Sequence, residues 1–254
     1  MDRRQILKAF AGLAACPLCA SAGLAAENHP HWSYEGATGP EKWGDLDAAD
    51  QACGIGRQQS PVDIAGAIKA RQSSLGLRWS KRPDTIVNNG HTIQLSFADG
   101  DRLNMGGRSY KLTQFHFHHP SEHHLEGKPF AMEAHFIHAA DGGGLAVVGV
   151  FMTPGKRNAV FNKIVSTMPA EEGPPVPADH AIDPNGLLPA QRAYYHYEGS
   201  LTTPPCSETV DWIVFAHPIE VTQDDVERFA KLYPMNARPV QKLDRRFILS
   251  SGAR

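Results

Sequence analysis

The sequence is poor in cysteine and in net charge, and it has no long run of strongly apolar residues. Only four of its 254 residues are cysteines, so a dense disulfide framework cannot replace a hydrophobic core. The formal net charge of -2 gives no electrostatic reason to expect nucleic acid or an acidic membrane as a partner. Internal repeats and low-complexity tracts are also missing, which argues against a fibrous or disordered chain. These absences favour one globular domain that folds without needing a metal.

The first 26 residues differ in kind from the rest of the chain. Arg3 and Arg4 stand near the start, and residues 9–26 carry no charge and are rich in Ala, Leu, Gly and Cys. Such small residues do not make a membrane span, which needs about 20 strongly apolar residues. We therefore expect residues 1–26 to be a twin-arginine-like signal peptide and residues 27–254 to be a periplasmic domain.

A lipoprotein signal is the second interpretation of this segment. Leu13–Cys16 resembles a lipobox, and lipidation of Cys16 would anchor the domain to a membrane. That choice would leave a very short apolar core in the signal. Cleavage after Ala22 or Ala26, where small residues cluster, is therefore preferred.

Export decides how the two remaining cysteines are interpreted. Cys53 and Cys206 follow the signal segment. In an oxidising compartment two cysteines favour one disulfide, although the residues alone leave open a pair of free buried thiols.

Short β-type segments, separated by Gly, Pro, Asn and Asp clusters, dominate the rest of the sequence. We expect strands at residues 92–97, 111–118, 131–138, 145–151 and 210–216. Helices are few: a capping-box-like start at Thr222 precedes apolar residues at helical spacing, and residues 159–168 form a second candidate. Residues 173–189 are rich in proline and predict a loop. The pattern is typical of a single, mainly β domain with helices at its margins.

Three histidines can converge from two of these predicted strands. Side chains alternate along a strand, so Gln114, His116 and His118 share one face. Glu133 and His135 share a face of the next strand by the same rule. Three neutral nitrogen ligands and an open fourth position are the ligand set of a catalytic zinc. Gln114 and Glu133 each precede a candidate ligand by two residues, where they can hold its second ring nitrogen.

Motifs spread over nearly all of residues 27–254 carry a family resemblance. They are, in order, Trp32–Tyr34, Gly39–Trp43, Gln58–Ile64, Asn88–His91, Gln114–His118, Ser121–His123, Glu133–His135, Leu145–Gly149, Tyr197–Pro205, Trp212 and Asn236–Pro239. With these motifs the chain resembles the exported, bacterial α-class carbonic anhydrases. The resemblance implies a zinc lyase that reversibly hydrates carbon dioxide to bicarbonate and a proton. It also implies a large, central, twisted and mostly antiparallel sheet, in a monomer or homodimer without a membrane span.

The resemblance gives roles to the residues that match its motifs. The zinc ligands and the groups that support them match His116, His118, His135, Gln114, Glu133 and the backbone carbonyl of Asn236. Thr202 matches the residue that accepts a hydrogen bond from zinc-bound hydroxide and donates its own proton to Glu122. His91 matches the proton shuttle, because an imidazole with a pKa of about 6.5 can pass a proton to buffer. Cys53 and Cys206 match positions that are bridged in exported members of the family.

Other matches line the substrate site and the proton path. The apolar wall that holds carbon dioxide, and the residue that contacts bicarbonate, match Ile137, Val147, Leu201, Val210, Trp212 and Thr203. The groups that hold a water chain between zinc and His91 match Tyr34, Asn89 and Gln94. His91 and Gln94 have opposite parity along a strand, so we expect a β-bulge between them if both line one cavity.

One segment departs from the family pattern. Residues 118–122 form a shorter stretch than in the vertebrate enzymes, with His119 and Pro120 where those enzymes have Trp and Gly. His119 has the opposite parity to His118, so we interpret it as structural or exposed and not as a fourth ligand.

Two other functions are compatible with part of the pattern. His116 and His118 followed by Glu122 resemble the first half of a cupin motif, in which all three would bind iron or manganese. That interpretation leaves residues 201–205 unexplained. A non-catalytic binding domain related to carbonic anhydrase would have lost zinc ligands, whereas all three are present here.

Overall fold

The computed structural model describes residues 31–72, 75 and 77–252, which belong to one compact unit beginning at His31. The predicted signal segment, with Cys16 and both predicted cleavage positions, lies outside the described residues. Within the described ranges, no helix is both long and apolar enough to cross a membrane.

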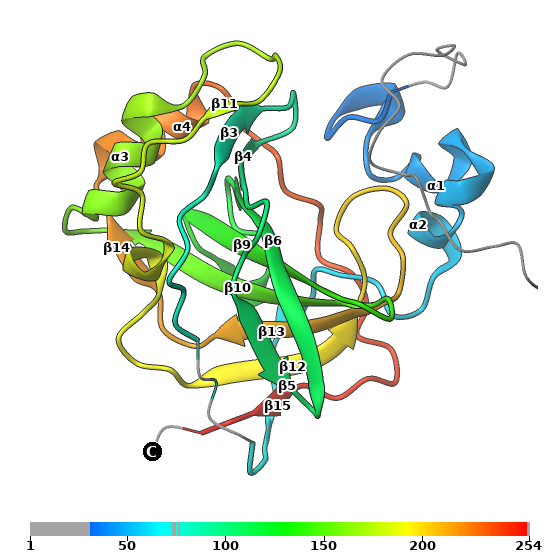
Figure 1. Cartoon of the computed structure of the whole chain (residues 1–254). Helices are drawn as coiled ribbons and strands as arrows, with labels where there is room; N and C mark the ends of the chain where they lie inside the picture. The colour runs from blue at the N-terminus through cyan, green and yellow to red at the C-terminus, as the bar shows by residue number, and fades with distance from the viewer. Residues whose placement is uncertain (1–30, 73–74, 76, 253–254) are drawn as a thin grey trace, which may run out of the picture. The chain divides into compact units, whose positions relative to one another are not determined.

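A twisted sheet forms the centre of this unit (Figure 1). In the part of the chain described, the sheet has 12 strands in the order β11-β3-β4-β6-β9-β10-β13-β12-β15-β2, with β5 beside β6 and β14 beside β10. Their bounds are β2 Ile68–Lys69, β3 Thr85–Asn88, β4 Ile93–Ser96, β5 Arg102–Met105, β6 Arg108–His118, β9 Met132–Ala140, β10 Leu145–Pro154, β11 Val176–Pro177, β12 Tyr194–Gly199, β13 Val210–Phe215, β14 Ile219–Val221 and β15 Leu249–Ser250. Most neighbours are antiparallel, whereas β10 pairs in parallel with β13 and β14, and β15 with β2. The predicted mainly β fold is confirmed.

A second, smaller sheet forms separately from the large one. It joins β1 (Asp63–Ile64), β7 (His124–Leu125) and β8 (Lys128–Pro129). The chain thus leaves the large sheet after β6, passes through this small sheet, and returns as β9.

The register of β6 against β9 follows from their buried faces. Phe115 and Phe136 are paired in register and fully buried, with ring centroids 5.1 Å apart. Because side chains alternate, the next pair, His116 and His135, meets on the opposite face. A one-residue slip would expose these phenylalanines, each worth roughly 1.5–3 kcal/mol of burial, so the core fixes the register that joins the histidines.

Helices are short and lie outside the sheet. They are α1 (Trp43–Leu46), α2 (Ala52–Ile55), α3 (Ala159–Thr167) and α4 (Gln223–Ala230). The two predicted helices are confirmed: Asn158 caps α3, and Thr222 caps α4 by accepting a hydrogen bond from the Asp225 backbone. The predicted loop at residues 173–189 also contains the two-residue strand β11 and a 3-10 turn, Pro184–Leu187.

Apolar side chains cover both faces of the large sheet. Val148 and Ile213 belong to the larger cluster, whereas their strand neighbours Val147 and Trp212 belong to a second cluster. The second cluster shares its face with His116 and His135, because Val147 lies opposite Ile137 in the register of β10 and β9. The site is therefore built on one face of a sheet whose other face is closed by the main core.

Candidate functional site

Three imidazoles meet where β6 and β9 lie side by side. His116 and His118 come from β6, and His135 from β9. Their ring centroids are 4.5 Å (His118 to His135), 5.0 Å (His116 to His118) and 5.5 Å (His116 to His135) apart. One nitrogen atom of each lies within 4.8 Å of the others. The structure thus brings together the three predicted ligands.

The second ring nitrogen of each histidine is held by an oxygen that can only accept a hydrogen bond. The bonds are His116 Nδ1 to Gln114 Oε1 (2.8 Å), His118 Nδ1 to the Asn236 carbonyl (2.7 Å), and His135 Nε2 to Glu133 Oε1 (2.9 Å). Because each bonded nitrogen carries the proton, the other nitrogen presents a lone pair to the site. His118 Nε2 is buried there without a hydrogen-bond partner among the described residues. Three converging lone pairs, one of them orphaned, fit a metal ion.

Electrostatics keep two of these imidazoles neutral. Burial, and then the neighbouring imidazoles, lower the pKa of His116 well below its usual range. Burial also lowers the pKa of His118. Burial acts the same way on His135, but the Glu133 carboxylate outweighs it and raises the pKa of His135. Glu133 itself stays ionised, because His123 and His135 together overcome burial and hold its pKa well below normal.

A second group of ligand-type residues lies behind His135, but it is a hydrogen-bond network. His123 Nδ1 donates to Glu133 Oε1 at 2.8 Å, and His123 Nε2 is hydrogen-bonded to the Tyr197 hydroxyl at 2.6 Å. Both nitrogens of His123 are therefore occupied. The Tyr197 hydroxyl also bonds Ser60 Oγ at 2.9 Å. The sequence alone gave no role to His123, Tyr197 or Ser60. Tyr197 is 74 residues from His123 and 137 residues from Ser60, and no local pattern relates positions so far apart.

Glu122 is buried beside the histidines. Its Oε1 accepts a hydrogen bond from the Arg238 backbone N–H at 2.9 Å. Its Oε2 lies 3.6 Å from His118 Nε2 and 3.8 Å from His135 Nδ1. This oxygen has no hydrogen-bond partner in the described part of the chain, so it is available to a donor such as the Thr202 hydroxyl, which the family resemblance implies. Thr202 is buried in the loop after β12, and its bond to Glu122 stays a prediction.

The residues predicted to hold carbon dioxide gather in one apolar cluster on this face. The cluster contains Val147, Val210 and Trp212, with Ile137 and Leu201 packed against it. The Trp212 ring centroid lies 4.8 Å from that of His135. An apolar surface therefore borders the candidate metal position. Thr203, the predicted bicarbonate contact, follows Thr202 in the same loop between β12 and β13.

His91 lies in the turn before β4, which begins at Ile93. Its ring stacks on Trp32, with centroids 3.7 Å apart, and on His31 at 4.8 Å. Burial, then His31, lowers the pKa of His91 against the opposing charge of Glu172. The neutral imidazole, which can accept a proton, is therefore favoured to a lower pH than usual.

The prediction of a β-bulge between His91 and Gln94 is wrong. His91 precedes β4, so the alternation of a strand does not apply to it, and Gln94 pairs in register with His116. The register shift in this region lies instead in β6, between Leu112 and Gln114. Asn89 is another predicted proton-path residue, and its side-chain oxygen accepts a hydrogen bond from the His91 backbone N–H at 3.0 Å.

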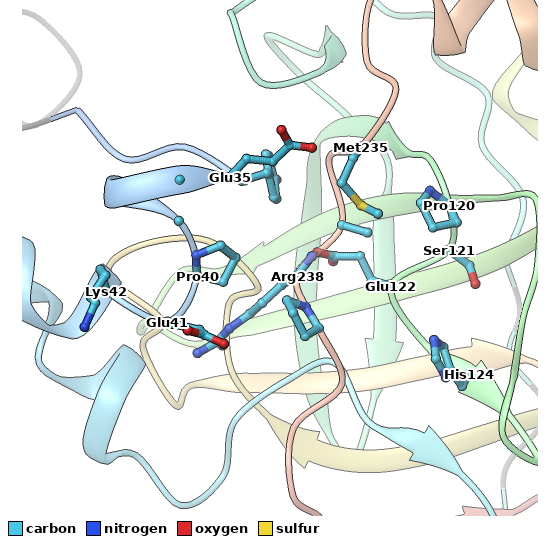
Figure 2. Close-up of a pocket in the computed structure, with 15 residues that line it drawn as sticks. Glu35, Pro40, Glu41, Lys42, Pro120, Ser121, Glu122, His124, Met235 and Arg238 are labelled. Carbon is cyan, nitrogen blue, oxygen red and sulfur yellow. The ribbon is translucent and has the colours of Figure 1, made fainter.

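Tyr34 completes the set of predicted proton-path residues. Burial and then the nearby Glu122 raise its pKa well above the usual range, so it stays a neutral hydroxyl. Tyr34 and Glu122 both line a cavity of about 520 Å³. Figure 2 shows Glu35 and Pro40 on one side of it, Pro120 on the other, and Glu122 between them. None of the three imidazoles lines this cavity, so it adjoins the site without containing it.

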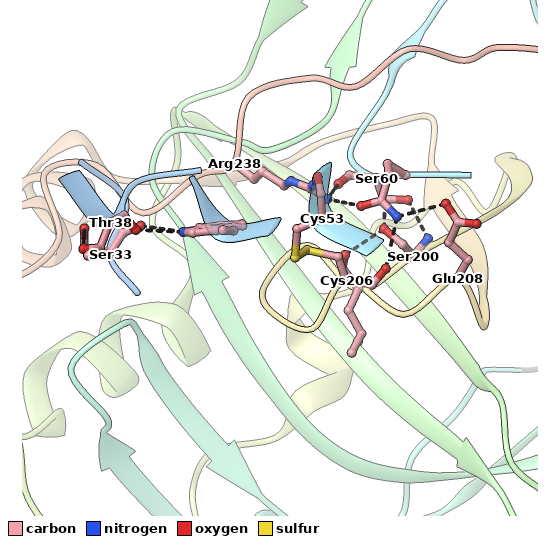
Figure 3. The surroundings of a disulfide bond; sticks show 11 residues. Ser33, Thr38, Cys53, Ser60, Ser200, Cys206, Glu208 and Arg238 are labelled. Carbon is pink, nitrogen blue, oxygen red and sulfur yellow. Dashed lines mark hydrogen bonds between the residues drawn. A yellow bond between two sulfur atoms is a disulfide. The ribbon is translucent and has the colours of Figure 1, made fainter. Parts of the chain in front are cut away.

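The structure contains the Cys53–Cys206 disulfide (Figure 3). Its Cα atoms are 5.0 Å apart, and both cysteines pack against Trp43 in a third apolar cluster. Cys53 belongs to α2, whereas Cys206 lies in the loop that carries Thr202. The disulfide therefore joins the N-terminal helices to the loop beside the histidines.

Known proteins resemble this chain over the whole described sheet. A family model described as eukaryotic-type carbonic anhydrase matches residues 38–252. A carbonic anhydrase of Nostoc sp. is 40% identical over 227 residues, which cover 87% of this chain and 86% of that protein. The solved structure of a hyperthermostable carbonic anhydrase identified from an active hydrothermal vent chimney has a TM-score of 0.84 at 44% identity, covering 87% of this chain and 100% of that one. The α-carbonic anhydrase of Thermovibrio ammonificans, solved in complex with the inhibitor sulfanilamide, has a TM-score of 0.81 at 44% identity, covering 86% and 98%.

Proposed function

Because the chain belongs to the eukaryotic-type (α) carbonic anhydrase family, we propose that it hydrates carbon dioxide with a zinc ion held by His116, His118 and His135. The observation that carries this proposal is the convergence of three imidazole nitrogens whose partner nitrogens are all tied to acceptors. Three neutral imidazoles with room for a fourth ligand are the usual donor set of a catalytic zinc.

Zinc, when bound, lowers the pKa of a water molecule to about 7 and so supplies a nucleophile at neutral pH. The protein's own contribution to this step is orientation. Glu122 is fixed on one oxygen by the Arg238 backbone, and its other oxygen faces the site. We propose that this oxygen accepts a hydrogen bond from the Thr202 hydroxyl, which leaves the Thr202 oxygen to accept a hydrogen bond from the nucleophile.

The apolar cluster next to His135 holds the substrate in this proposal. Carbon dioxide has no charge and no hydrogen-bond donor, so contact with Val147, Leu201 and Trp212 is a suitable way to bind it. Bicarbonate is charged, and an apolar wall does not favour it, which supports release of the product. Thr203 is the proposed polar contact for bicarbonate.

The proton leaves through His91 in this mechanism. His91 has a buried Nε2 without a hydrogen-bond partner among the described residues, and its lowered pKa keeps the accepting form available. Water held by Tyr34, Asn89 and Gln94 would connect it to the site. Attack on carbon dioxide and export of the proton are thus separate steps carried by separate residues.

Export of the protein is part of the proposal. The Cys53–Cys206 disulfide supports it, because disulfides persist in oxidising compartments such as the periplasm. Residues 1–26 as a removable signal, residues 27–254 as the mature domain, and a monomeric or dimeric state stay predictions. So does lipidation of Cys16, the second interpretation of the signal.

One experiment tests the proposed function. Stopped-flow measurement of carbon dioxide hydration, with metal content determined on the same samples, compares the wild type with His116→Ala and His119→Ala. The ring of His119 bonds the Pro234 carbonyl and not the site, so this control should retain zinc and activity. His116→Ala should lose both, since two imidazoles remain for the metal. Zinc-loaded wild type without hydration activity would refute the proposal, and stoichiometric iron in place of zinc would favour the cupin-like alternative.

A further inference from the structure

The irregular segment at residues 235–240 touches the site at two points. The Asn236 carbonyl accepts a hydrogen bond from His118 Nδ1, and the Arg238 N–H donates to Glu122 Oε1. The segment has no helix or strand hydrogen bonds of its own to fix its course. Something else must hold these two backbone groups in place.

Two buried side chains anchor the segment, and they face different parts of the molecule. The Asn236 amide donates to the Phe117 and His91 carbonyls at 3.0 and 2.9 Å, and its oxygen accepts the His119 N–H at 2.7 Å. Asn236 is therefore fixed to the end of β6. That anchor serves the bond to His118.

Arg238 provides the second anchor, on the side of the disulfide. Its guanidinium donates to Gln59 Oε1 (2.8 Å), to the Ser60 carbonyl (2.8 Å) and to the Cys53 carbonyl (3.0 Å). The Gln59 amide in turn donates to the Cys206 carbonyl at 3.1 Å. Figure 3 shows Arg238 extending from its own segment toward Cys53 and Ser60.

The bonds of Arg238 are better suited to fixing the position of the segment than to stabilising the fold. Arg238 is only 2% exposed, and its three partners are neutral oxygens. Burying a cation without a carboxylate partner costs free energy that an apolar side chain would not. Several charge-assisted bonds in a planar fork, however, define the position of a guanidinium more narrowly than apolar packing can.

We propose that Arg238 is a positioning residue for Glu122, in the hydration reaction that the proposed function describes. Its guanidinium is held by Cys53, Ser60 and Gln59, and this fixes the backbone N–H that orients the Glu122 carboxylate. Glu122 Oε2 then faces the imidazole nitrogens at 3.6 Å or more. Loss of the side-chain anchor lets the N–H and the carboxylate shift together, which weakens orientation of the nucleophile and leaves the metal ligands in place.

Arg246 offers a matched control. Its guanidinium also binds neutral oxygens, the carbonyls of Gln59, Glu198, Lys242 and Leu243, none of which belongs to a proposed site residue. It also lies 5.6 Å over an aromatic ring, as Arg238 does. Replacing either arginine therefore removes a comparable set of side-chain bonds, whereas only residue 238 also bonds Glu122, through its backbone N–H.

The test compares Arg238→Gln, Arg238→Lys and Arg246→Gln with wild type in kcat/KM per zinc-loaded site, zinc Kd by chelator competition, and Tm. We expect Arg238→Gln to lower kcat/KM roughly 10- to 100-fold, the effect of a small misplacement near the chemistry, with an unchanged zinc Kd. Arg238→Lys should recover part of the loss, because an ammonium can still donate to Ser60 and Gln59. Arg246→Gln should lower Tm and keep kcat/KM within about twofold, because it meets Gln59 only at the backbone carbonyl, whereas Arg238 is held by the Gln59 side chain.

Several results would overturn the role of Arg238. Wild-type kcat/KM in Arg238→Gln, or an equal loss in Arg246→Gln, makes it a structural residue. If Arg238→Gln does not fold, Arg238→Lys decides, and wild-type kcat/KM in that variant refutes the proposal. A crystal structure of the Lys variant is the readout independent of activity, with a longer distance from Glu122 Oε1 to the residue 238 nitrogen expected. An inactive wild type in the same assay counts against the proposed function and not against this contact.

Discussion

We expect the protein to lose stability in mild acid because of His138, a buried residue outside the candidate site. It lies on β9 with its side chain in the main core, fully buried and near the ring of Trp79. Its Nδ1 is hydrogen-bonded to the Phe136 carbonyl at 3.0 Å, and its Nε2 has no partner among the described residues. Burial outweighs the nearby carbonyls and lowers the pKa of His138 to about 4.

The sign and size of the effect follow from the difference between the folded and unfolded states. In the unfolded chain an exposed imidazole has a pKa of about 6.5. Below that pH the unfolded state binds a proton that folded His138 refuses until about pH 4. Stability is therefore complete above pH 6.5 and falls as the pH drops through this window, by about 2 kcal/mol at pH 5 and about 3 kcal/mol at pH 4.

Urea unfolding of wild type and His138→Leu, followed by tryptophan fluorescence from pH 7.5 to 5, measures this term. Other titrating groups, the candidate metal ligands included, contribute equally to both proteins and cancel in the difference. The stability of wild type relative to His138→Leu should fall by about 2 kcal/mol over this range. The exposed His180→Leu should show no such trend, because water surrounds that side chain in both states. A wild-type-minus-variant difference that stays constant with pH would refute the reasoning.

The remaining predictions concern proton exit and the disulfide. His91→Ala should lower kcat in dilute buffer by about 10-fold or more, keep kcat/KM, and recover with imidazole buffer, because it removes the proton acceptor and not the attack step; equal kcat in dilute buffer would contradict this role. Wild-type kcat should persist below pH 6.5, since burial lowers the pKa of His91. Reduction of Cys53–Cys206, which closes a separation of 153 residues, should lower the free energy of unfolding by up to about 5 kcal/mol. It should also lower kcat/KM through the Thr202 loop, whereas the same Tm and turnover with and without reductant would exclude that link.

The parts of the molecule that were predictable from the sequence are those with a local period. Alternation along β6 and β9 correctly gave His116 and His135 one face each of their strands, and the structure shows Phe115 and Phe136 buried on the opposite face. The capping residue Thr222 located the start of α4, because a helix start depends on side chains only three positions apart, and the predicted helix at residues 159–168 matches α3 within one residue. The same alternation failed at His91, which lies in a turn where side-chain direction follows the turn and not the strand.

Contacts across long separations carried no such signal. Arg238 and Glu122 are 116 residues apart, and Arg238 and Cys53 are 185 apart, so neither pattern nor spacing relates them. Arg238 lies in a segment without periodicity, where a buried arginine looks in the sequence like any exposed one. The family resemblance included its motif but gave it no role.

The division between predicted and unpredicted residues has a structural cause. The candidate ligands sit on strands, where register and alternation set their positions within the sheet, and a sequence records both. The groups that would orient the reaction, Glu122 and Thr202, sit in loops, whose backbone takes its position from distant side chains. In this molecule those side chains are polar, buried and linked to a disulfide. A few fixed hydrogen bonds therefore hold these loops, in place of the regular hydrogen bonds of a strand. If Arg238→Gln spares zinc binding and lowers kcat/KM, holding the metal and orienting the reaction depend on separable parts of the fold.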